Sequence, residues 1–397
     1  MCRVWFVLEA KIITRSVSEV RKTAHLAYDS GYEWMSPSFA RESFCIIMSA
    51  NSELAARSTT QSGVNVSDKK YDVFGVGNAI VDILAQVEDH VINDLSLNKG
   101  SMALMTTEQQ GDILTAINDP SLTFAAGGSA ANSMVAIAQS GGTAVYTGRV
   151  ADDTNGAYYK KGMEQEGIKF YVPLAENAAE PTGSSVILTT PDAERTMCTH
   201  LGISTELAKA DVDFDMLAES KCCYVEGYLW TSDGPREACL EVFKHAKKNG
   251  VLTSFTFSDS FLVDLFAEQF RDLVREHCDI IFCNADEAKK FVGSDDLEHC
   301  VKEIGAMCGK SFITDGGNGS YIAIDGNIAK VDGFEVKAID TVGAGDAFAG
   351  GVLYGLTNGL PPEKSARWGN YLASRVVSKY GPRLDESIAG EMQEAIA

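Results

Sequence analysis

From Tyr71 to the C-terminus, short apolar runs alternate with longer amphipathic runs. The short runs are typical of buried strands, and they predict strands at YDVFGVG, TAVYTGRV, CCYVEGYL, LTSFTF, DIIFCN, SFITDG and the segment ending in KAID. The longer runs predict helices at AANSMVAIAQSG, DGPREACLEVFKHAKKNG and SDSFLVDLFAEQFRDLVREH. Because apolar strands that alternate with helices form parallel sheets covered on both faces, we predict an α/β fold around a mostly parallel sheet.

Three parts of the chain depart from this rhythm. Residues 83–106 and 168–200 alternate at period two without long helices, which predicts a small β-rich flap inserted into the main domain. Residues 1–70 have no sustained period and end in a polar stretch, NSELAARSTTQSGVNVSDKK, that is typical of a linker. We therefore expect a disordered extension over residues 1–70 and one folded domain over residues 71–397.

The extension leaves two hypotheses open. Translation starts at Met48, so that residues 1–47 are not part of the protein, or the extension is a targeting peptide. Acidic residues argue against a transit peptide, which is poor in acids: Glu9, Glu19, Asp29 and Glu33. We find no secretory signal and no apolar run of about 18 residues, and we expect a cytoplasmic protein without a membrane partner.

Charge narrows the choice of partner. The chain has 34 lysines and arginines against 55 acids, a formal net charge of −21, so nucleic acid and anionic membranes are poor partners. An anionic substrate must then be held by local features such as helix N-termini, glycine loops or a divalent cation. The ten cysteines are scattered apart from Cys222 and Cys223, and the spacing of the others fits no common zinc template, so we expect reduced thiols.

The stretch DTVGAGDAFAGG, residues 340–351, joins a predicted strand to a predicted helix. Gly343, Ala344 and Gly345 would form the turn at the helix N-terminus, where unpaired backbone N–H groups can bind an anion. Asp346 would lie in the first helical turn, where its carboxylate can remove a proton from an attacking hydroxyl. The alternative is a tight turn in which Asp346 only caps the helix.

Two glycine motifs lie closer to the N-terminus. FGVGNAIVD has Ile80 where a dinucleotide fingerprint needs its third glycine, but Asn78 and Asp82 follow a strand and can bind a vicinal diol. In AAGGSAANS, Gly128 permits close backbone approach, Ser129 is a candidate helix N-cap, and Asn132 would lie on the first turn. The alternatives are a solvated loop acid and an ordinary helix start.

Two further motifs lie in the second half of the chain. In DIIFCNADEAKKF, Asn284 ends a strand and Glu287 lies on the first helical turn, which is weak evidence unless a metal–phosphate group is nearby. In FITDGGNGSYI, the glycines indicate either a hairpin turn or a strap that binds phosphate or base.

Together these motifs resemble, in order, those of the ribokinase-like (PfkB) family of carbohydrate and nucleoside kinases. The resemblance runs from about Tyr71 to the C-terminus through GVGNAIVD, GGSAANS, PTGSSVILTTPDAERTM, EGYL, NADE, ITDGGNG, DTVGAGD and GNYLASRVVSKYG. It implies a three-layer α/β/α domain with an inserted β-sheet lid. It also implies phosphorylation of a primary alcohol that depends on ATP and Mg²⁺, with K⁺ as an additional ion in some members.

The resemblance implies a role for each motif residue, in four groups. Asp346 matches the catalytic base, and Gly343, Ala344 and Gly345 match the anion hole. The positions that bind sugar hydroxyls are Asn78, Asp82, Gly128 and Asn132. The positions beside the nucleotide are Thr314, Gly316, Gly319 and Asn370. The metal positions are Asn284 and Glu287, which organise Mg²⁺ through water, and Asp340, which matches a monovalent cation site.

The substrate is less sharply indicated. The Asn78 and Asp82 pattern is similar to the adenosine kinase branch, which implies adenosine as acceptor, AMP as product and a place in purine salvage. A free-sugar kinase for ribose, fructose or a keto-deoxy acid is the alternative, and Arg195 is the arginine available for such an acid. A catalytically silent ligand-binding protein is the second alternative. Candidates for stacking on a purine are Phe170, Tyr171 and Phe261, and we expect a monomer or homodimer.

Overall fold

The computed structural model describes residues 69–397 except 120, 172 and 193, and these belong to a single compact unit. The predictions made for the N-terminal extension, including a start at Met48, fall on residues 1–68 and lie outside the described residues. No helix in the described part of the chain is long and apolar enough to cross a membrane.

In the described part of the chain, the larger of two sheets has nine strands. In spatial order they are β14 (Asn327–Val331), β13 (Ser320–Ile324), β12 (Lys310–Thr314), β11 (Ile280–Asn284), β10 (Leu252–Thr256), β9 (Ser220–Glu226), β1 (Tyr71–Val76), β5 (Ala144–Thr147) and β6 (Lys169–Phe170). All neighbours pair in parallel except β12 with β13 and β13 with β14. The predicted mostly parallel sheet is confirmed.

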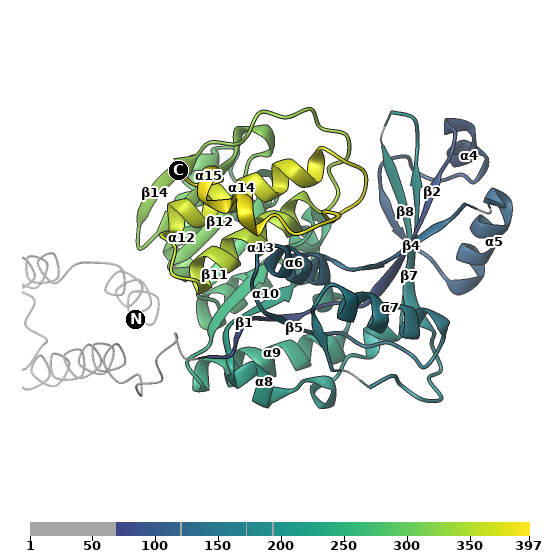
Figure 1. The fold of residues 1–397 in the computed structure, drawn as a ribbon, viewed down its shortest axis with the longest axis horizontal. Coiled ribbons are helices and arrows are strands. Elements are labelled where there is room, and N and C mark those ends of the chain that lie inside the picture. The colour runs from purple at the N-terminus through teal and green to yellow at the C-terminus, as the bar shows by residue number, and fades with distance from the viewer. Residues whose placement is uncertain (1–68, 120, 172, 193) are drawn as a thin grey trace, which may run out of the picture. The chain divides into compact units, whose positions relative to one another are not determined.

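Helices cover both faces of this sheet (Figure 1). Side chains of β1, β9, β10 and β11 pack on one face against α8 (Phe214–Ala218), α9 (Asp233–Lys248), α10 (Ser260–His277), α11 (Ala285–Val292) and α12 (Leu297–Cys308). The other face packs against α6 (Ser129–Gln139), α7 (Thr154–Gln165), α13 (Ala344–Thr357) and α14 (Pro362–Val377). Because both faces of β1 are buried, its sequence YDVFGV does not alternate. The short helix α15 (Met392–Ala395) ends the chain beside α14.

The smaller sheet forms a lid beside this body (Figure 1). Its strands, in spatial order, are β3 (Met102–Leu104), β8 (Arg195–Gly202), β7 (Thr182–Thr189), β2 (Ile80–Gln86) and β4 (Thr123–Gly127). Helices α4 (Asp89–Asp94) and α5 (Thr107–Ile117) pack on its outer face over the apolar side chains of Ile83, Val186 and Cys198. Alternate positions on the same strands, such as Asp82 and Ile187, face a pocket, as the period of two in a strand requires.

The lid boundaries differ from the expected segments 83–106 and 168–200. Its strands lie within residues 80–127 and 182–202, and this stretch includes the eleven-residue helix α5. Residues 169–170 instead form β6, which pairs with β5 at the edge of the larger sheet. Alternation at period two marks a strand with one buried face, but it does not say which sheet the strand joins.

The strand expected before DTVGAGD is absent from the structure. Residues 332–338 have no regular secondary structure. The N–H groups of Ile339 and Asp340 donate to the carbonyl oxygen of Val377, at 2.7 and 3.2 Å, at the end of α14. The alternating run FEVKAI therefore satisfies its last backbone groups on a helix terminus, because no neighbouring strand is present to pair with it.

Candidate active site

A pocket of about 370 Å³ lies between the lid and the carboxyl ends of the central strands. The lid contributes a largely apolar wall made by Ile80, Met102, Leu104, Ile187, Met197 and Leu201. The body contributes polar and acidic groups, among them Asn78, Ser129, Asn132, Glu226, Asn284, Glu287, Thr314 and Asp346. Motifs more than 200 residues apart in the sequence thus share one cavity.

The glycine turn before α13 borders this pocket. Gly343 is the residue before the helix and has φ 78°. A Cβ there would lie 2.3 Å from the carbonyl oxygen of Pro382, so backbone conformation and close packing both require glycine. Gly345 differs, because a Cβ there would meet no protein atom within 4 Å. Since the first N–H groups of a helix lack intrahelical acceptors, the turn is suited to bind an anion.

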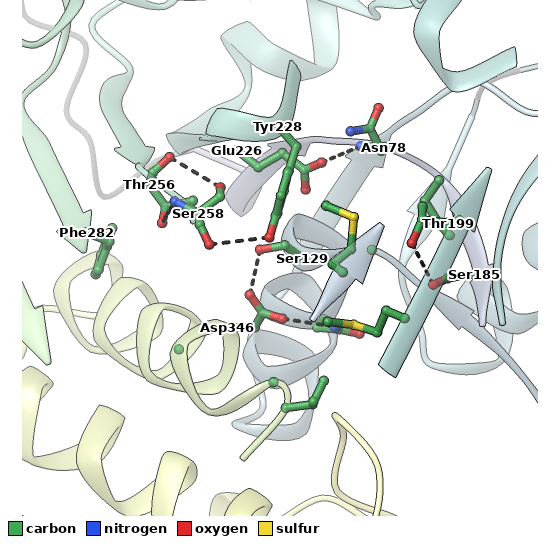
Figure 2. Close-up of a pocket in the computed structure, with 18 of the residues that line it drawn as sticks. Asn78, Ser129, Ser185, Thr199, Glu226, Tyr228, Thr256, Ser258, Phe282 and Asp346 are labelled. Atoms are coloured by element: carbon green, nitrogen blue, oxygen red, sulfur yellow. Dashed lines mark hydrogen bonds between the residues drawn. The ribbon is translucent and has the colours of Figure 1, made fainter. Parts of the chain in front are cut away.

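Asp346 lies in the first turn of α13 and opens onto the pocket. Its carboxylate oxygens accept hydrogen bonds from Ser129 Oγ at 2.6 Å and from Asn132 Nδ2 at 2.9 Å (Figure 2). Burial raises the pKa of Asp346 to about 6, against the opposing effects of these two hydrogen bonds and of Arg383. The group is therefore an ionised carboxylate near neutral pH with a proton affinity suited to a general base.

Asn78 and Asp82 approach the same pocket from the loop after β1 and from lid strand β2. Asp82 is buried, and burial raises its pKa to about 7, with Arg383 and Arg195 opposing the shift. Gly128 has φ 98°, and a Cβ there would lie 2.3 Å from the carbonyl oxygen of Asn78. The glycine thus lets the loop after β1 and the start of α6 meet beside the pocket.

Glu226 connects these two segments. It ends β9 and is 1% exposed. One carboxylate oxygen accepts the Asn78 N–H at 2.7 Å (Figure 2), and the other accepts the Ala130 N–H at 2.8 Å. Burial raises the pKa of Glu226 to about 7. Its side chain therefore holds the loop that carries Asn78 against the N-terminus of the helix that carries Asn132.

Asn284 and Glu287 form a capping box at the start of α11. Asn284 Oδ1 accepts the Glu287 N–H at 2.8 Å, while the Glu287 carboxylate accepts from the Asn284 backbone and side chain at 3.1 and 2.8 Å. Both residues also line the pocket beside Thr314. Burial raises the pKa of Glu287 to about 7, so its charge lacks compensation. A cation in the pocket would supply that compensation.

The remaining predicted nucleotide residues lie outside the pocket lining. Gly316 and Gly319 belong to the tight connection between β12 and β13, and a Cβ on Gly319 would lie 2.2 Å from the Val331 carbonyl oxygen. Asn370 on α14 donates through Nδ2 to the carbonyl oxygens of Val331 and Asp332, at 3.1 and 3.2 Å. In this structure these residues hold the β14 end of the sheet, and their contact with a nucleotide stays a prediction.

Asp340, the predicted monovalent cation residue, pairs with Arg195 of the lid. The Arg195 Nη2 to Asp340 Oδ2 distance is 2.5 Å, and the two side chains are 6% and 2% exposed. Asp340 also accepts the N–H groups of Gly381 at 2.8 Å and Val342 at 3.1 Å. Its carboxylate is thus occupied by protein donors, and the cation site stays a prediction.

The three aromatic residues predicted as candidates for stacking on a purine lie in different environments. Phe170 is buried in the core, where its ring stacks on Tyr146 with centroids 6.0 Å apart. Tyr171 is 58% exposed and does not line the pocket. Phe261 does line it, together with Tyr228, whose ring centroid lies 6.3 Å away. Only Phe261 is therefore positioned to contact a ligand in this pocket.

Sequence analysis gave Ser129 the wrong role and missed two other contributing residues. Ser129 is not the N-cap, which is Gly128; its hydroxyl donates to Asp346 instead. Glu226 and Arg383 were not singled out at all. The glutamate in the apolar run CCYVEGYL was a signal, since a buried strand rarely carries an unpaired acid. Nothing near Arg383 in the sequence indicates its contact with Asn132.

The chain matches the family model described as pfkB family carbohydrate kinase over residues 89–389. It is 25% identical over 336 residues to the adenosine kinase of Schizosaccharomyces pombe, which covers 79% of this chain and 96% of that enzyme. It is 26% identical over 341 residues to the 5-dehydro-2-deoxygluconokinase of Bacillus licheniformis, covering 83% and 97%.

Solved structures agree with this match. A probable sugar kinase from Rhizobium etli has a TM-score of 0.78 at 35% identity, covering 83% of this chain and all of that one. The adenosine kinase from Sinorhizobium meliloti has a TM-score of 0.77 at 34% identity, covering 82% and 99%. With this fold and family match, the chain belongs to the pfkB carbohydrate kinase family, in its adenosine kinase-like branch, and is a phosphotransferase that acts on an alcohol group.

Proposed function

We propose that the protein transfers the γ-phosphoryl group of ATP to the 5′-hydroxyl of adenosine, giving AMP. The observation that carries this proposal is the single pocket that joins Asn78 and Asp82 to Asp346 and the start of α13. A vicinal diol such as that of ribose offers two hydroxyl groups to a carboxylate and an amide. Because Asp346, Gly343 and Gly345 line the same pocket, an acceptor hydroxyl held by Asn78 and Asp82 would share this cavity with a phosphoryl group bound at the glycine turn.

Charge argues against an acidic acceptor. Among the described residues, no lysine, arginine or histidine lines the pocket, whereas Asp82, Glu226, Glu287 and Asp346 do. Arg195, the arginine available for an acid, is paired with Asp340 instead. A carboxylate on the acceptor would lie among like charges without a partner, so the keto-deoxy acid alternative is disfavoured.

The lid wall favours a nucleoside over a free sugar. Met102, Leu104 and Met197 present apolar surface to the pocket from the lid, and Phe261 presents an aromatic ring from α10. A purine would cover this surface, and burial of apolar area contributes about 25 cal/mol per Å². A ribose or fructose molecule would satisfy Asn78 and Asp82 but would leave the apolar wall in contact with water.

In the proposed reaction, Asp346 accepts the proton of the attacking hydroxyl, and the backbone N–H groups at the start of α13 stabilise charge on the transferred group. Ser129 and Asn132 hold the carboxylate in place through their hydrogen bonds. Glu287 and Asn284 fit a magnesium ion held through water, because one carboxylate and an amide beside substrate phosphates are typical of such sites. When bound, Mg²⁺ neutralises charge on the phosphates.

The Asp346→Asn variant tests the role of the base. We expect affinity for ATP and adenosine to stay within roughly tenfold and turnover to fall at least about a hundredfold, because an amide cannot accept the proton. Asp325→Asn is a matched control, since Asp325 is an exposed turn residue with φ 49° that asparagine also tolerates. Near-normal turnover of the Asp346 variant would refute the assignment.

A panel of acceptors tests the substrate. ADP release is measured with adenosine, inosine, ribose, fructose and keto-deoxygluconate at equal concentrations, and adenosine should be turned over fastest. Faster turnover of ribose or fructose would favour the sugar kinase alternative. Thermal stabilisation by these ligands without any ADP release would favour a catalytically silent binding protein.

A further inference from the structure

Arg383 lies in the turn that follows α14 and is fastened on two sides. Gly381, at the start of this turn, donates its N–H to Asp340 at 2.8 Å, and Pro382 packs against Gly343. On the other side, Gln139 of α6 donates through Nε2 to the carbonyl oxygen of Leu384 at 2.9 Å. The turn is thereby held against both the anion-binding turn and the helix that carries Asn132.

The guanidinium of Arg383 begins a chain of hydrogen bonds that ends on Asp346. Arg383 Nε donates to Asn132 Oδ1 at 2.8 Å, and Asn132 Nδ2 donates to Asp346 Oδ2 at 2.9 Å. A guanidinium only donates, so it binds the oxygen end of the amide and turns the amino end toward the carboxylate. Without the arginine, the amide could rotate and present its oxygen to Asp346, which would be repulsive.

Among the described residues, the positive charge of the Arg383 guanidinium is not neutralised by a carboxylate in direct contact with it. Within the described part of the chain Arg383 forms no salt bridge, and its Nη2 is buried without a hydrogen-bond partner. Arg195 also has buried nitrogens without a partner, Nε and Nη1, but it differs because Asp340 neutralises its charge at 2.5 Å. Arg383 is thus the less compensated of the two cations that act on the carboxylates of the pocket.

Several groups act on the charge of Asp346. Burial disfavours the ionised form of Asp346, and the charge of Asp346 in turn raises the pKa values of Asp82 from β2, Glu226 from β9, Tyr224 and Tyr228. Arg383 opposes this effect and holds the pKa of Asp346 lower than burial alone would. Removing the arginine should therefore raise the pH at which the carboxylate becomes protonated.

We propose that Arg383 is a positioning residue for phosphoryl transfer, which orients Asn132 toward Asp346 and maintains the carboxylate as a base. The inference rests on the proposed role of Asp346. It assigns no contact between Arg383 and the substrate, because Arg383 does not line the pocket. Its effect should therefore appear in turnover and in the pH profile, and only weakly in substrate affinity.

The test compares kcat–pH profiles of Arg383→Met and Arg383→Lys with that of the unchanged protein. We expect the methionine variant to lose at least tenfold in kcat at pH 7, to move its acidic limb to higher pH, and to keep both KM values within about threefold. The lysine variant retains the positive charge but lacks the planar set of N–H donors of the guanidinium. The acidic limb of its kcat–pH profile should therefore stay in place, while kcat recovers only in part. Arg375→Met on the exposed part of α14 is the matched control and should change neither quantity.

A double-mutant cycle separates this role from a general effect on folding. If Arg383 acts through Asn132, Asn132→Ala combined with Arg383→Met should lower kcat by much less than the product of the two single effects. A lower melting temperature with an unmoved acidic limb and multiplicative effects on kcat would overturn the inference. Loss of turnover in Asp346→Asn alongside an unaffected Arg383→Met would refute this inference alone, whereas an active Asp346→Asn would refute the proposed function.

Discussion

Replacing Gly345 with alanine should separate stability from activity. A Cβ at this position would meet no protein atom within 4 Å, and the residue does not have a positive φ. The substitution therefore introduces neither a clash nor backbone strain. Because glycine within a helix is less stable than alanine, the variant should gain up to about 0.5–1 kcal/mol in the free energy of unfolding.

Activity should move in the opposite direction. Gly345 lines the pocket at the start of α13, where we propose that the transferred phosphoryl group approaches the backbone. A methyl group there occupies that approach, so we expect kcat/KM for ATP to fall at least about tenfold, equivalent to about 1.4 kcal/mol of transition-state stabilisation. Urea denaturation measures the first effect, and ADP release at varied ATP concentration measures the second.

Gly343→Ala supplies the contrast. With φ 78° and a Cβ position 2.3 Å from the Pro382 oxygen, this variant should lose at least about 1–2 kcal/mol of stability from the left-handed conformation alone. Unchanged kcat/KM in Gly345→Ala, with stability equal to or above that of the unchanged protein, would refute the anion-binding role of this turn. A marked loss of stability in Gly345→Ala would refute the argument that a Cβ at this position has room.

Two further predictions concern buried charges. Arg195→Met leaves the Asp340 carboxylate buried without its partner, so the free energy of unfolding measured in urea should fall by about 3–5 kcal/mol. Combining Arg195→Met with Asp340→Asn should recover part of that loss. A loss of less than about 1 kcal/mol for the single variant would contradict this account. Glu226→Gln leaves one of two backbone N–H groups without an acceptor, so it should cost about 1–3 kcal/mol and raise the acceptor KM more than the ATP KM. Equal changes in the two KM values would show that Glu226 does not act through the acceptor side.

Much of the fold could be read from local patterns. The run YDVFGV has no polar face and forms a strand buried on both sides, and DIIFCN does so as well, up to its exposed last residue Asn284. Lid strand β2, IVDILAQ, packs on helices on one side and faces the pocket on the other, and it begins three residues before the predicted flap segment 83–106. Where the prediction was wrong, as at FEVKAI, the pattern was compatible with a strand but no partner strand was available. Strand formation needs a neighbour that local sequence does not specify.

The residues of the candidate site also fall into those that the sequence could predict and those that it could not. Gly343, Asp346 and Asn132 could be singled out from sequence because their chemistry depends on short spacings: small residues at a helix start and a carboxylate within one turn. The partners of those residues could not, since Ser129 and Asp346 are separated by 217 positions, and Asn132 and Arg383 by 251. The sequence indicated Arg195 only as a candidate for binding an acidic ligand. Its pairing with Asp340 could not be predicted, because it depends on how the lid packs against the body.

The sequence by itself thus determined the alternation of strands and helices, the glycine turn and the place of the candidate base Asp346 just after it. These follow from backbone conformation and from side-chain chemistry within a few residues. Tertiary structure alone decided which charged side chains meet which partners. Arg195 neutralises Asp340, Glu226 joins the loop after β1 to the start of α6, and Arg383 is connected to Asp346 through Asn132. The reason is that Coulomb forces and hydrogen bonds depend on distance in space, which the crossover connections of a parallel sheet set independently of distance along the chain.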